Sequence, residues 1–185
     1  MLERVRGIDL CTDELGIPLW IMFPLVVSVL QAGKRAAAYL HSLGHHKHSS
    51  LRVTIHAGED FVHLLGGLRR VGEAIEVLRL GEGARIGHAV ALGIDVQGWA
   101  DRTRKLFLPV GERLMDLIWL RRFVGREDDL CSKWLPSIDR DLQRVASRLF
   151  GASYSSIDLE QWWEAIHDPD RLKHAGFPEG PPPRS

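Results

Sequence analysis

The sequence has little cysteine, no excess of charge and no hydrophobic run of membrane-spanning length, and each absence excludes a class of protein. Two cysteines, Cys11 and Cys131, among 185 residues cannot form a disulfide framework or a four-cysteine zinc site. Their scarcity is typical of a reducing compartment, so we expect a cytoplasmic protein. The 24 basic and 24 acidic residues cancel, and the net charge therefore gives no indication of a nucleic-acid or anionic-membrane partner.

The most apolar run, residues 17–30 ("IPLWIMFPLVVSVL"), is too short to cross a bilayer, because a spanning helix needs about 20 residues. Pro18 and Pro24 also interrupt it. No basic segment followed by an apolar one begins the chain, so we expect no targeting signal. We interpret the run as a buried loop that leads into a core helix, with a membrane anchor as the alternative.

What the first part does contain is an alternation of strand and helix patterns. Strands are expected at 5–10, at 49–56 and within 84–92, where β-branched residues gather. Between them, helices are expected at 25–43, ended by Gly44, and at 61–80, ended by Gly81 and Gly83. This order predicts βαβ units and a parallel sheet, in either a barrel or a doubly wound fold.

After about residue 94 the pattern becomes helical. Amphipathic helices are expected at 109–125, at 137–150 with Ser137 as the N-cap, and at 155–166. We therefore divide the chain into an α/β portion (1–100), a helical insert or cap (101–172) and a Pro/Gly-rich tail (173–185) that we expect to lack fixed structure.

Polar residues follow each of the three expected strands, in "DLCTDE", "HAGED" and "GHA". The carboxyl ends of parallel strands carry the catalytic groups of α/β folds, so these segments predict one composite site. Within it, His56 is a candidate zinc ligand, Glu59 a proton shuttle and His88 a group that orients a hydroxide. We expect Asp9 to make structural hydrogen bonds and Cys11 to be a buried, inert thiol; Asp13 and Glu14 fit either a pocket rim or a solvated turn.

At these residues the chain resembles the adenosine and AMP deaminases, which are zinc enzymes on a TIM barrel within the amidohydrolase superfamily. The resemblance rests on "VTIHAGED" followed by "ARIGHAVAL", with "GIDLCTDE" before them, and covers roughly residues 5–92. It implies that His56 is a zinc ligand, that Glu59 protonates the purine ring nitrogen and that His88 stabilises the attacking hydroxide. Thr12 and Asp13 would contact the substrate.

The chain departs from this family in two respects. Thr12 stands where the family usually has a substrate-contacting glycine, so a side chain occupies space that a purine would approach. The family also takes two zinc ligands from an H-x-H on its first strand and one from a terminal aspartate. The only H-x-H, His46-Lys47-His48, precedes the strand that ends in His56, and we expect it to be a solvated loop at the wrong end of the barrel. The acidic pairs lie beside helical sequence and are not convincing ligands: Asp128 with Asp129, and Asp168 with Asp170.

A full (β/α)8 barrel needs about 250 residues, and three βα units are visible here. We therefore predict an α/β fold with partial TIM-barrel units and parallel strands, followed by a mainly helical segment, and we read the chain as a middle section of a larger or split deaminase. The expected function is zinc-dependent deamination of a purine nucleoside or nucleotide. The alternatives are a catalytically inactive scaffold or assembly subunit, including a homo-oligomer, and an amidohydrolase with another substrate.

Overall fold

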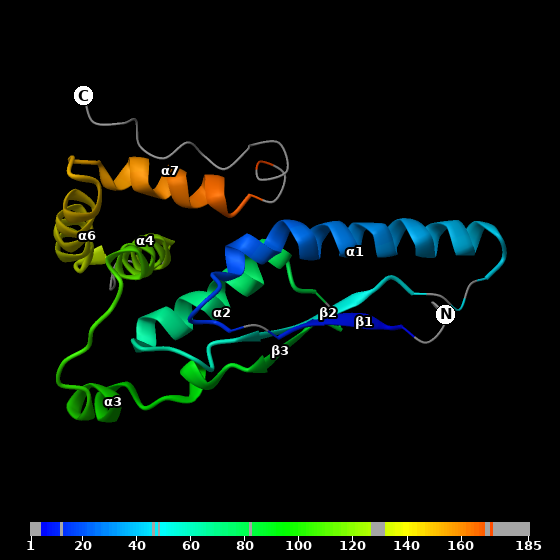
Figure 1. Ribbon diagram of the computed structural model, residues 1–185, viewed down its shortest axis with the longest axis horizontal. Coiled ribbons are helices and arrows are strands. Elements are labelled where there is room, and N and C mark those ends of the chain that lie inside the picture. The colour runs from blue at the N-terminus through cyan, green and yellow to red at the C-terminus, as the bar shows by residue number, and fades with distance from the viewer. Residues whose placement is uncertain are drawn as a thin grey trace.

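The protein is a mixed α/β structure built on a small parallel sheet (Figure 1). This computed structural model describes residues 5–11, 13–45, 47, 49–81, 83–126, 132–168 and 171. The sheet has three strands in the order β1-β2-β3, where β1 is Gly7–Leu10, β2 is Arg52–Ala57 and β3 is Arg85–His88. Both strand pairs are parallel, which confirms the α/β class and the parallel strands expected from the sequence.

Helices connect the strands and form the rest of the described chain. They are α1 (Leu19–Ser42), α2 (Leu64–Leu78), the 3-10 turn η1 (Val90–Gly93), α3 (Val96–Arg102), α4 (Val110–Arg126), α6 (Leu135–Phe150) and α7 (Ser156–Ile166). Figure 1 shows α3, α4 and α6 on the side of the molecule toward which the carboxyl ends of the strands point. Helix α3 was not predicted from the sequence, and residues 173–185, the expected tail, lie outside the described part of the chain.

The two faces of the sheet differ in chemistry because side chains alternate along each strand. One face of β2 carries Val53, Ile55 and Ala57, all buried against α1 and α2. The other face carries Arg52, Thr54 and His56, none of which is buried. The helices thus cover one face of the sheet, and the opposite face stays open and polar.

Helix α1 begins earlier than the sequence pattern predicted. It starts at Leu19 instead of Leu25 and contains Pro24, so the expectation of a buried loop before the helix was wrong. A proline inside a helix removes one backbone hydrogen bond, but Leu19 and Phe23, one turn apart, are 1% and 0% exposed in the core. By length and composition alone this helix could cross a membrane, and only 11% of its apolar window is buried; Leu19, Phe23 and Val26 are the residues by which it packs into the core of the sheet.

Three further helix ends differ from the expectations. His63 caps α2, because its Nδ1 accepts a hydrogen bond from the Leu65 N–H at 3.0 Å. The same helix ends at Arg79, in the left-handed conformation (φ 47°), and not at a glycine. Helix α6 begins at Leu135, so Ser137 lies inside it and is not its N-cap. The start of α7 was predicted correctly: Ser155 forms a capping box with Asp158.

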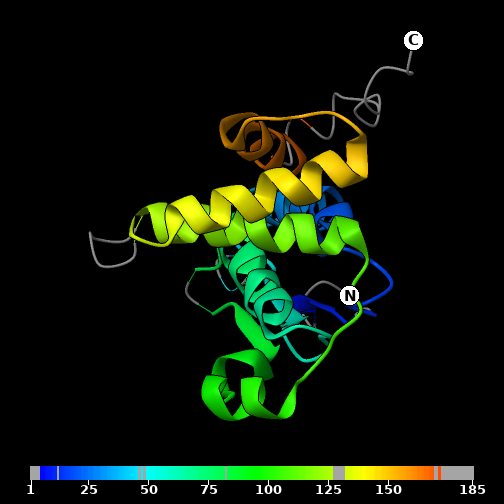
Figure 2. The same cartoon turned by 90° about the vertical axis from the view of Figure 1, so that its left-hand side faces the viewer.

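The three long helices of the second part, α4, α6 and α7, form a core of their own (Figure 2). Its buried residues are Leu114, Leu117, Ile118, Leu142, Ala146, Leu159 and Trp163.

Helix α4 is also joined to α2 by buried charges. Arg69, 2% exposed, is 2.6 Å from Glu73 of its own helix and 2.8 Å from Asp116 of α4. In α2 the apolar Ile75 is 48% exposed, whereas the charged Arg69 and Glu73 are buried.

Candidate metal and acid–base centre

Three side chains from the carboxyl ends of β2 and β3 meet on the open face of the sheet. His56 Nδ1 lies 3.5 Å from Glu59 Oε1, and His88 Nε2 lies 3.2 Å from Glu59 Oε2. One ligand atom from each residue can be chosen so that all three lie within 4.8 Å of one another. The side chains are 19%, 25% and 52% exposed in chain order, so the group is open to solvent on the side of His88.

A glycine in β3 makes this meeting possible. His56 pairs across the sheet with Gly87, and a Cβ at that position would stand 2.9 Å from Cδ2 and 3.0 Å from Nε2 of the imidazole. Such contacts are closer than carbon atoms tolerate. The absence of a side chain at Gly87 therefore gives the His56 ring room to lie over β3, 4.9 Å from the ring of His88.

Two backbone amides of the HAGED turn are held by a residue from the first loop. Glu14 is 1% exposed, and its carboxylate accepts hydrogen bonds from the N–H of Gly58 at 2.8 Å and of Glu59 at 3.1 Å. Of the two roles left open for Glu14, pocket rim or solvated turn, this burial excludes the solvated turn. Charge-assisted hydrogen bonds of this kind are the stronger ones in proteins, so Glu14 fixes where the Glu59 side chain begins.

The same turn is held from two other directions. The N–H of Ala91 in η1 donates to the carbonyl of Gly58 at 2.8 Å. From α2, Arg70 Nη1 donates to the carbonyl of Asp60 at 3.1 Å. The turn that carries Glu59 is thus fixed by the first loop, by the segment after β3 and by α2.

Backbone strain accompanies the end of β3. His88 and Ala89 adopt positive φ angles of 59° and 46°, a region that costs residues other than glycine about 1 kcal/mol or more each. The strain turns the chain sharply after β3, so that the His88 imidazole faces Glu59. Strained residues of this kind gather at functional sites.

Two polar groups from β1 and its loop approach the outer side of the His56 ring. Asp9 Oδ1 is 3.7 Å from His56 Nε2 with its side chain 59% exposed, and Cys11 Sγ is 3.9 Å from His56 Nδ1. Cys11 is exposed, so the expectation of a buried thiol was wrong. Asp9 lies in β1 and Cys11 directly follows that strand, so these two residues are what the first strand brings to the surroundings of His56.

The other residues named from the sequence lie apart from this group or outside the described chain. The carboxylate of Asp13 accepts from the N–H groups of Leu15 and Gly16, each at 3.1 Å, and so closes its own turn. Asp168 lies 3.5 Å from Arg171. The remaining candidates lie outside the described residues: Thr12, His46, His48, Asp128, Asp129 and Asp170.

A small hollow of about 120 Å³ lies on the far side of the HAGED turn, between α2 and α4. Val62 and His63 line it from the turn, and Glu112 lines it from α4. Burial, together with the charge of Arg113, lowers the pKa of His63, so this imidazole is neutral at pH 7. Because His63 is also an N-cap that faces Trp99, we assign it a structural role.

The sequence predicted that His56, Glu59 and His88 would lie together, as they do, but it did not indicate that Glu14 and Gly87 position them. The signal for Gly87 was present in "RIGH", because a glycine inside a strand often marks a close approach of another group to the backbone.

Comparison with models of known protein families gives no match for this chain, and the curated proteins include none with a significantly similar sequence.

Proposed function

We propose that the chain provides part of the active centre of a zinc-dependent hydrolase of the adenosine deaminase type. The observation that carries the proposal is the meeting of His56, Glu59 and His88 at the carboxyl ends of adjacent parallel strands. Parallel α/β folds place their catalytic groups at that edge. The proposed fold is a portion of a TIM barrel, and the open face of the sheet is the face that would line its interior.

The residues present fit a zinc ion. The imidazole of His56 is a ligand type that zinc prefers. Ligand atoms of Glu59 and His88 can be chosen within 4.8 Å of one of its nitrogens, so both side chains lie close enough to act on water bound to the ion. In this proposal His56 holds the ion, and further ligands come from outside the described residues or from another chain.

The protein's own groups have distinct roles in the proposed reaction. A bound zinc ion supplies the Lewis acidity that makes hydroxide available near neutral pH. Glu59 holds a proton between the two histidines and delivers it to the ring nitrogen of a purine, as the family resemblance implies. His88, 3.2 Å from Glu59, orients the nucleophile by hydrogen bonding. Glu14 keeps Glu59 in place through the turn.

Zinc content tests the metal part of this proposal. Untagged protein dialysed against a weak chelator is expected to retain zinc, and His56→Ala is expected to lose it. The matched control is the double variant His46→Ala/His48→Ala, which removes the H-x-H and should leave the zinc unchanged. Loss of zinc in the control but not in His56→Ala would show that the loop, and not the HAGED corner, binds the metal.

Turnover tests the chemical part. We expect ammonia release from adenosine, AMP or adenine, and Glu59→Gln should abolish it while zinc content and the circular dichroism spectrum stay unchanged. Activity that survives in Glu59→Gln would refute the proton-transfer role. Turnover of a different amine or amide, with none of the purines, would favour another amidohydrolase. We propose a cytoplasmic location for either enzyme.

An assembly subunit without activity is the second candidate, and one observation favours it. Among the described residues, β1 and β3 each pair with β2 alone, so both outer edges of the sheet offer backbone groups to another strand. A stable complex that forms equally well with wild type and Glu59→Gln, without turnover in either, would support this function.

A further inference from the structure

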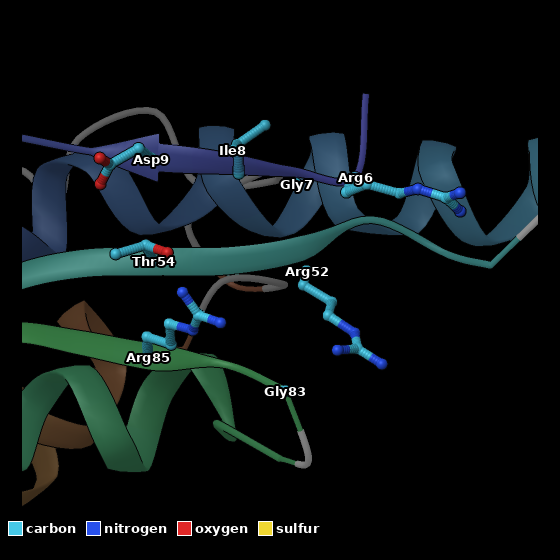
Figure 3. Close-up of a pocket in the computed structure, with 8 residues that line it drawn as sticks. All are labelled: Arg6, Gly7, Ile8, Asp9, Arg52, Thr54, Gly83 and Arg85. Atoms are coloured by element: carbon cyan, nitrogen blue, oxygen red, sulfur yellow. The ribbon is translucent and has the colours of Figure 1, made fainter. Parts of the chain in front are cut away.

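A second polar hollow lies on the open face of the sheet, at the ends where the strands begin (Figure 3). Its volume is about 340 Å³, and all three strands contribute to its walls. Arg6 precedes β1, Arg52 begins β2 and Arg85 begins β3. Thr54 stands between them on the same face, two residues before His56 and so about 7 Å from it along the strand. The hollow is therefore separate from the proposed zinc centre.

The three arginines of this hollow, unlike several others in the described part of the chain, have no carboxylate partner. Seven arginines elsewhere in the described chain form ion pairs within 4.0 Å of a carboxylate: Arg69, Arg70, Arg121, Arg122, Arg126, Arg144 and Arg171. Among the described residues no such pair involves Arg6, Arg52 or Arg85. The one carboxylate in the lining, Asp9, lies 3.7 Å from His56. Three positive charges thus share a hollow with one negative charge.

The backbone around the hollow leaves room for a guanidinium group. Gly83 has a φ of 81°, and a Cβ there would stand 2.5 Å from Cζ and 2.6 Å from Nε of Arg52. The Arg52 guanidinium therefore lies directly over a glycine that precedes β3. Figure 3 shows Arg52 extending beside Gly83 and Arg85 reaching from β3 toward β2, so the two side chains flank the space between these strands.

We propose that this hollow is a binding site for a phosphate group. Guanidinium groups bind phosphate through paired N–H donors in a fixed fork, and the Thr54 hydroxyl adds a donor on the floor. A phosphate group also brings up to two negative charges, which an excess of positive charge favours over a single carboxylate. The inference does not depend on the proposed zinc chemistry, because it uses none of His56, Glu59 and His88; Asp9 alone borders both the hollow and the His56 ring.

Isothermal titration of the full chain with pyrophosphate at low ionic strength tests the site. One pyrophosphate is expected per chain, and Arg52→Gln and Arg85→Gln should each weaken binding about tenfold or more. The matched control is Arg35→Gln, which removes an exposed arginine of α1 and should change the affinity less than twofold. Circular dichroism verifies that each variant is folded, as expected for exposed side chains.

Further variants and ligands in the same titration distinguish specific binding at this site from nonspecific electrostatic attraction and identify the source of the phosphate. Arg52→Lys keeps the charge but loses the fork, so its affinity should fall between those of wild type and Arg52→Gln. Asp9→Asn removes the one opposing charge and should tighten binding. Tighter binding of ribose 5-phosphate than of orthophosphate would indicate a phosphorylated metabolite, and the reverse would indicate free phosphate. No binding by wild type, or equal losses in Arg35→Gln and Arg52→Gln, would overturn the proposal.

Discussion

Replacement of Arg69 by methionine is the most severe test of how the helical part is joined to the sheet. The Arg69 side chain is 2% exposed and lies 2.6 Å from Glu73, 2.8 Å from Asp116 and 2.5 Å from Glu112. Methionine has a similar volume and no charge. The substitution would therefore leave the packing nearly filled and remove one positive charge from among three carboxylates.

The expected loss of stability follows from what remains buried. The side chains of Glu73 and Asp116 are 0% and 2% exposed, so neither can turn to water without opening the contact between α2 and α4. Breaking a buried ion pair from one side costs about 3–5 kcal/mol. A domain of this size is stable by about 5–15 kcal/mol, so Arg69→Met should bring the protein close to unfolding at 37 °C.

Urea denaturation at pH 7, followed by tryptophan fluorescence, measures this loss. The matched control, Arg35→Met, makes the same substitution at an exposed position of α1 and should change the free energy of unfolding by less than about 0.5 kcal/mol. The double variant Arg69→Met/Glu73→Gln should recover part of the loss, because it removes one of the uncompensated charges. A loss below about 1 kcal/mol in Arg69→Met would show that the carboxylates already share protons or water, and would refute this reasoning.

Three further predictions concern the same network and the proposed centre. Burial raises the pKa of Glu73, but the charge of Arg69 outweighs this effect and holds the pKa below its usual value. The ionised carboxylate therefore stabilises the fold at neutral pH. The urea midpoint should fall as the pH drops below about 4, where the carboxylate becomes protonated. Glu14→Gln replaces a carboxylate that accepts from two N–H groups with an amide that has one acceptor oxygen, so the free energy of unfolding should fall by about 1–3 kcal/mol in thermal melts. Gly87→Ala would place a Cβ 2.9 Å from the His56 ring. The substitution should weaken zinc binding at least tenfold in a chelator competition assay. An unchanged affinity would show that the ring has room to move.

The strands and the central side chains could be predicted because their signals are local. The β-branched run Val53, Thr54 and Ile55 favours a strand by itself, and the strand's end then fixes where His56 points. His88 is likewise the last residue of β3, although its positive φ angle, which the sequence does not indicate, turns its ring toward Glu59. Parallel pairing brings the two ends together, so the meeting of these histidines with Glu59 follows from the order of the strands along the chain.

The features that sequence reasoning missed depend on partners far along the chain. Glu14 is buried because Gly58 and Glu59, 44 and 45 residues away, donate to it, and nothing in "CTDE" itself indicates this. Arg69 is buried because α4 brings two of its carboxylates to α2. The early start of α1 was missed for a different reason: Pro24 weakens the local helical preference, and the burial of Phe23 outweighs it.

These long-range contacts also bear on the role of the helical second part. Glu112 of α4 lies 2.5 Å from Arg69 and 3.3 Å from Arg70, and Arg70 donates to the backbone carbonyl of Asp60. Asp60 follows Glu59 directly, so a continuous chain of ion pairs and hydrogen bonds connects α4 to the turn that carries the proposed proton donor. An insert that served only as an appendage would not need charges buried at its contact with α2. The second part of the chain thus supports the HAGED turn from behind, in the same way that Glu14 supports it from the first loop.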